Sequence, residues 1–108
     1  MDNQEQKEQR EYERYPFRED ILIDGRKQAY SQNICETGMF VSTLSPPKKG
    51  SVIHVTIPSI LTLKAEVNNS QPGIGMGIEF IDLNYEQKRE IKQLIEDIKL
   101  GDFNNSSQ

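Results

Sequence analysis

Cysteine, histidine and long apolar runs are scarce in this 108-residue chain, which contains one cysteine and one histidine. A single cysteine cannot form a disulfide within the chain, so nothing in the sequence requires an oxidising compartment. No apolar run reaches the length that spans a bilayer, and the N-terminus lacks the apolar stretch of a signal peptide. We therefore expect a cytoplasmic protein with no direct membrane insertion.

Catalytic and metal-binding groups are equally sparse. His54 lies in the alternating segment VIHVTI, where it shares a face with Val52 and Thr56, so we expect it on the outside of a sheet. A metal site needs several converging ligands, and one histidine and one cysteine on separate strands do not supply them. The glycines of PGIGMGIEF lack the Lys-Ser/Thr that follows a phosphate-binding loop. We expect no catalytic residue, no metal and no cofactor.

The charge balance argues against nucleic acid as a partner. The chain has 17 acidic and 13 basic residues, which give a net charge of −4. Proteins that bind DNA or RNA gain most of their affinity by neutralising phosphates, so an acidic chain is poorly suited to that task. A small phosphorylated ligand could still bind where a few arginines are concentrated.

Short strands dominate the pattern after residue 20. The Asp24-Gly25 pair predicts a hairpin, and residues 61–67 alternate between apolar and polar side chains, as a half-buried strand does. The predicted strands are ILIDG, a return strand from about Arg26 to Ile34, MFVST, SVIHVTIP, LTLKAEVN and IGMGIEFI.

One helix closes the pattern. Asn84 is a suitable N-cap with Gln87 three residues later, an apolar stripe follows at helical spacing, and Gly101 is placed to stop the helix. We predict a six-stranded antiparallel β-barrel with one C-terminal α-helix, spanning residues 14–100. The polar segments 1–13 and 101–108 are expected to be a flexible tail and a disordered tail.

Arginines recur at a fixed interval before the first of these strands. Arg10, Arg14 and Arg18 are each four residues apart. The guanidinium group can donate two bonds at once to a phosphate or to the O6/N7 edge of guanine, and it stacks on purine faces. On a flexible lead-in, such groups could close over a guanine nucleotide. A solvated, charge-balanced tail explains the same spacing, because acidic residues are interleaved.

The lone cysteine lies in the segment QNICETGMF, between Asn33 and Gly38. Cys35 could be a nucleophile, a metal ligand, a redox sensor or a small side chain in a turn. Asn33 and Cys35 are two residues apart, so an extended backbone would direct both to one side. Gly38 would allow a positive φ or a close approach of a ligand.

These two segments together resemble the PilZ domain family. The resemblance rests on Arg-x-x-x-Arg (Arg14 and Arg18) followed by Asn-x-Cys-x-x-Gly (Asn33, Cys35 and Gly38), and it extends from about Arg14 to Leu100. It implies a six-stranded barrel that binds the bacterial second messenger cyclic di-GMP. The named residues would contact the ligand, with Arg10 as a possible addition, and the lead-in would become ordered on binding.

The sequence departs from the family's stronger pattern at Cys35, Asn33 and Glu13, and Asn33 in place of Asp keeps a carbonyl acceptor but loses a charge-assisted bond. Cys35 replaces the usual serine, and its thiol is a weak donor and acceptor, so it is either a serine substitute in the site or a buried thiol without a role. Glu13 stands directly before Arg14, where its charge would repel phosphates.

The resemblance implies a receptor that relays the messenger to a separate effector protein in motility, biofilm or exopolysaccharide control. The alternative is a degenerate domain that binds a protein partner and no nucleotide.

Overall fold

The structure, a computed structural model, describes residues 13–101, the side chains of residues 27 and 28 aside. Its elements are β1 (Tyr15–Pro16), β2 (Asp20–Ile23), β3 (Arg26–Ile34), β4 (Gly38–Ser42), β5 (Val52–Ile57), β6 (Leu61–Gln71), β7 (Gly75–Ile81) and α2 (Tyr85–Lys99).

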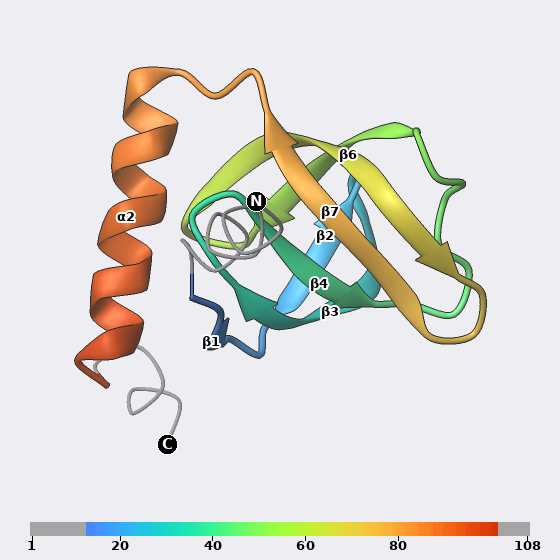
Figure 1. Cartoon of the computed structure of the whole chain (residues 1–108), viewed down its shortest axis with the longest axis horizontal. Coiled ribbons are helices and arrows are strands. Elements are labelled where there is room, and N and C mark those ends of the chain that lie inside the picture. Colours follow the sequence, from blue (N-terminus) through green and yellow to red (C-terminus); the bar gives the residue numbers. More distant parts are fainter. Residues whose placement is uncertain (1–12, 102–108) are drawn as a thin grey trace, which may run out of the picture.

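The strands close into a barrel (Figure 1). Around it the order is β3, β2, β5, β6, β7 and β4, and the pairing of β4 with β3 completes the circle. Every pairing is antiparallel, so the predicted six-stranded antiparallel barrel with a C-terminal helix is confirmed. Closure leaves these six strands without a long exposed edge. The seventh strand, β1, is an addition that the sequence pattern did not indicate.

Local sequence signals account for most of the strands. Asp24 and Gly25 both have positive φ, at 51° and 85°, as the predicted hairpin between β2 and β3 requires. On β5, Ile53, Val55 and Ile57 face the core and are at most 2% exposed. Strand β6 is longer than the predicted 61–68, because it continues through a register shift after Val67 and pairs with β7 as far as Gln71.

Helix α2 begins and ends where the sequence predicted. The Asn84 side chain accepts from the Gln87 N–H at 2.7 Å, while the Gln87 side chain accepts from the Asn84 N–H at 2.9 Å. Gly101 has a φ of 83°, the left-handed conformation that often follows a helix.

The apolar side of α2 joins the barrel core. Its stripe is Ile91, Leu94, Ile95 and Ile98, each at most 6% exposed and part of the core cluster. The helix stands beside the barrel (Figure 1), where it contacts β1 and β6. No helix within residues 13–101 is long and apolar enough to cross a membrane. Apart from Glu13 and Gly101, the predicted tails lie outside the described residues.

Candidate functional site

The segment that carries Arg14 and Arg18 is fastened to β3. Tyr15 pairs with Ile34, and Pro16 pairs with Asn33. Because a proline favours an extended backbone at the preceding residue, Pro16 keeps Tyr15 in the conformation that this pairing needs. The Phe17 N–H donates to the Gln32 carbonyl at 3.1 Å.

Two side chains anchor the segment from inside. Phe17 is 0% exposed and belongs to the barrel core. Ser31, also 0% exposed, donates through its Oγ to the Phe17 carbonyl at 2.6 Å and accepts from the Glu19 N–H at 2.9 Å. Residues 15–19 thus differ from the expected flexible lead-in, and ordering of the lead-in on binding stays a prediction. The strand pairing and the buried phenyl ring already fix this part of the chain.

The structure brings the two motifs together. The Arg14 guanidinium donates from Nη1 to the Asn33 side-chain oxygen at 2.8 Å, although 19 residues separate them. Arg18 is exposed, and its side chain has no hydrogen bond or ion pair with any other part of residues 13–101. The guanidinium of Arg18 is thus available to an anionic ligand. Arg10 lies outside the described residues.

The turn after β3 differs from the predicted geometry. Asn33 is half-buried, whereas Cys35 is only 3% exposed. The two side chains do not share one accessible side, because β3 ends at Ile34 and the chain then turns, with the Cys35 N–H donating to the Gly38 carbonyl at 2.8 Å. The Cys35 thiol lies 3.4 Å from the Thr37 hydroxyl, its neighbour in the turn.

Gly38 has a role that the sequence did not specify. It is not among the positive-φ glycines, which corrects one of the two expectations for this position. A Cβ at this position would collide with the Ile78 backbone carbonyl. Gly38 therefore allows β4 and β7 to pair closely at the end of the turn, and a ligand contact there remains a prediction.

The carboxylate of Glu13 is directed to a tyrosine. The Tyr15 hydroxyl donates to the Glu13 carboxylate at 3.0 Å. This bond raises the pKa of Tyr15, with smaller contributions from desolvation and from the negative charge of Glu13. Neither Arg14 nor Arg18 is ion-paired with Glu13.

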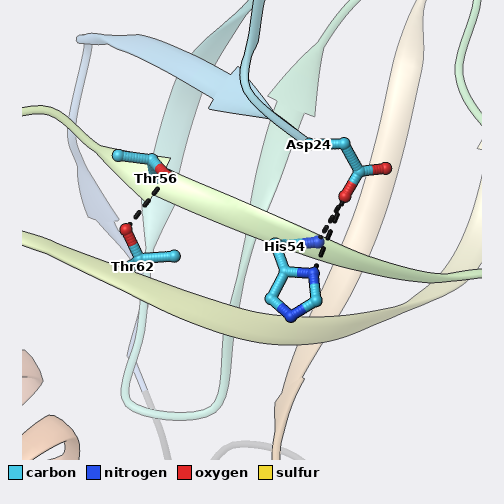
Figure 2. A network of polar contacts seen from close by, with 4 residues as sticks. All are labelled: Asp24, His54, Thr56 and Thr62. Carbon is cyan, nitrogen blue, oxygen red and sulfur yellow. Dashed lines mark hydrogen bonds and ion pairs between the residues drawn. The ribbon is translucent and has the colours of Figure 1, made fainter.

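The histidine lies on the barrel exterior, as predicted, with its side chain 62% exposed. Figure 2 shows it beside Asp24, whose carboxylate lies 3.8 Å from the imidazole and accepts from the backbone N–H of His54 at 2.9 Å. The Thr56 and Thr62 hydroxyls form a separate pair at 3.0 Å. Within residues 13–101, no three His, Cys, Asp or Glu side chains are grouped so that they could hold a metal ion.

Sequence reasoning missed Phe17 and Ser31. Phe17 could have been found as the one large apolar side chain between the two arginines, but Ser31 offers no local signal because a serine on a strand is usually exposed. Together these residues hold the backbone on both sides of Arg18 against β3.

The protein is a small closed barrel whose surface carries the guanidinium groups of Arg14 and Arg18 and the amide of Asn33. Such a surface is typical of a ligand-binding module. A family model described as the PilZ domain matches residues 8–97, so the chain belongs to the PilZ domain family. PilZ domains are binding modules rather than enzymes, and they generally bind cyclic di-GMP. None of the curated proteins matches the chain.

Proposed function

We propose that this protein is a receptor for cyclic di-GMP. The observation that carries the proposal is the Arg14–Asn33 hydrogen bond at 2.8 Å, because it joins the two motif segments into one surface. Arg18 lies on the same anchored segment, with its guanidinium unoccupied by any described residue. Two guanidinium groups beside an amide match the chemistry of a ligand that carries guanine edges and phosphates.

Each site residue has a proposed task. Arg14 and Arg18 bind guanine edges and phosphates, and Asn33 supplies an amide that bonds to a base edge. The buried thiol of Cys35 shapes the turn from inside, which favours the packing role over direct contact with the ligand. Arg10 is a possible further phosphate contact.

Calorimetric titration with cyclic di-GMP at near-physiological salt tests the proposal. Arg14→Ala and Arg18→Ala should each weaken binding by about 10- to 150-fold, the loss expected for hydrogen bonds to a charged group. Arg89→Ala is the matched control, because Arg89 is an exposed arginine on α2 that is ion-paired with Glu86. Equal affinities in all four proteins would contradict the assignment of the site.

The second candidate function is a protein-binding domain that no longer binds the nucleotide. The observation that favours it is the buried position of Cys35, where the family usually has serine. Absence of binding by the wild type, with binding restored by Cys35→Ser combined with Asn33→Asp, would support this candidate.

A binding domain passes its signal on through a surface that another protein reads. We propose an effector bound in trans, in motility, biofilm or exopolysaccharide control in a bacterial cytoplasm. A pull-down with and without cyclic di-GMP tests this step, and recovery of no ligand-dependent partner would count against it.

A further inference from the structure

The outer face of β3, β4 and β7 carries one half-buried aromatic side chain, Phe40. Its neighbours on β4, Met39 and Val41, are 0% exposed and face the core, so Phe40 and Ser42 face outward. The contacts of α2 with the sheet are mainly to β1 and β6, and the helix stands at one side of the barrel (Figure 1). A phenyl ring in this position is not needed to fill the core.

Glycines on β7 leave room for the ring. Phe40 pairs with Gly77, and a Cβ at Gly75 would lie 3.1 Å from Cε2 of the phenyl ring. The ring therefore lies over the glycine-bearing strand. The Asn69 amide covers Gly77, where its oxygen accepts from the Gly77 N–H at 3.3 Å. Because glycine has no side chain, the ring rests low on the sheet and its outer part stays accessible.

Polar side chains lie on β3, the strand on the other side of Phe40 from β7. On the other side of β4, Phe40 pairs with Asn33, the residue that binds the Arg14 guanidinium. Directly opposing residues in an antiparallel sheet hold their Cβ atoms about 4.5–5.5 Å apart. The Asn33 amide, with the Arg14 guanidinium bonded to it, therefore lies on the β3 side of Phe40, while the phenyl ring lies over β7. Gln32 donates to the Ser42 hydroxyl at 2.9 Å on the same face.

We propose that Phe40 is a stacking platform for one guanine base of the ligand, with Asn33 and Arg14 at the edge of that base. The inference rests on the proposed function and assigns a residue that neither motif contains. A flat apolar ring with an amide and a guanidinium group across the neighbouring strand suits a purine, which has a π-face and acceptors on its rim. Stacking of a base on an aromatic side chain contributes about 5- to 150-fold to affinity.

Three variants test the platform by calorimetry with cyclic di-GMP. Phe40→Leu keeps an apolar side chain over Gly75 but removes the π-face, so it should lose about 5- to 150-fold in affinity. Phe40→Tyr keeps the ring and should stay within about 2-fold of the wild type, since stacking tolerates such a change. Tyr85→Leu removes an aromatic residue that is 76% exposed on α2, outside the proposed site, and should leave binding unchanged.

A second measurement does not depend on the variants. The chain has four phenylalanines, so selective ring labelling allows the Phe40 protons to be followed in the wild type. Saturation with cyclic di-GMP should shift them upfield and produce a nuclear Overhauser contact with a guanine proton.

Wild-type affinity in Phe40→Leu, or unshifted Phe40 protons in a saturated complex, would overturn the platform while leaving the receptor intact. No binding by the wild type would overturn both, and the two failures are therefore distinguishable.

Discussion

Replacement of Ser31 with alanine should destabilise the barrel and release the segment between the two arginines. Ser31 is 0% exposed, and its hydroxyl bonds to the Phe17 carbonyl at 2.6 Å and to the Glu19 N–H at 2.9 Å. A buried polar group that loses its partner costs about 1–3 kcal/mol. We expect Ser31→Ala to lower the free energy of unfolding by about that amount, because alanine replaces neither bond.

Urea denaturation measures the effect as a fall in the midpoint at constant slope. Thr62→Ala is the matched control, because its hydroxyl makes a hydrogen bond to the Thr56 hydroxyl at 3.0 Å (Figure 2), but Thr62 is exposed. An exposed change of this kind should cost under about 0.5 kcal/mol. If the two variants lose the same stability, Ser31 does not anchor the segment and the reasoning is wrong.

The same variant should bind cyclic di-GMP more weakly under conditions where it remains folded. Arg18 lies between Phe17 and Glu19, the two residues that Ser31 bonds, so loosening them lets the guanidinium sample more positions. The ligand must then order the segment on binding, and each immobilised side chain costs about 0.5–1.5 kcal/mol. Unchanged affinity in a destabilised Ser31→Ala would show that the anchor serves stability alone.

Three further substitutions follow from the geometry. Gly38→Ala should destabilise the fold by about 1–3 kcal/mol in urea denaturation, because the added methyl group collides with the Ile78 carbonyl; wild-type stability would contradict the close pairing. Ile91→Ala should cost about 2–5 kcal/mol by the same assay, since Ile91 is 1% exposed where α2 joins the core; a loss under about 1 kcal/mol would mean that the helix is weakly docked. Tyr15→Phe tests the phenol pKa, which the Glu13 bond raises above its ordinary 10.0. The native state then holds this proton more tightly than the unfolded state does. The bond's contribution to the free energy of unfolding is therefore complete below about pH 10 and is lost as pH rises through the folded pKa. Between pH 9 and 11 the free energy of unfolding of Tyr15→Phe should fall less than that of the wild type. Equal falls in the two proteins would refute this reasoning.

Local signals made the barrel predictable from the sequence. The Asp24-Gly25 hairpin, the alternation around Ile53 and the capping box at Asn84 each depend on a few neighbouring residues. The missed features depend on residues far apart in the chain. Strand β1 is two residues long and exists only because Tyr15 and Pro16 meet the end of β3.

The candidate site was predictable as a set of residues but not as an arrangement. Motif spacing pointed to Arg14 and Asn33, yet no local rule states that one donates to the other across 19 residues. Gly38 illustrates the same limit, because the carbonyl that excludes a side chain there belongs to β7. The end of β3 at Ile34 was predicted, but the direction of the Cys35 side chain depends on the turn that follows, which the strand pattern does not describe.

The anchored segment changes how the departures from the family pattern should be weighed. A thiol in place of a hydroxyl removes at most one neutral hydrogen bond, worth about 0.5–1.5 kcal/mol. Fixing one residue's backbone costs about 1–2 kcal/mol, and here Phe17 and Ser31 fix the segment before any ligand arrives. A backbone that is already fixed around the two arginines therefore offsets any bond to the ligand that is lost at Cys35. On this ground the receptor is the stronger proposal, because a domain that had lost its ligand would have no need to hold Arg14 against Asn33.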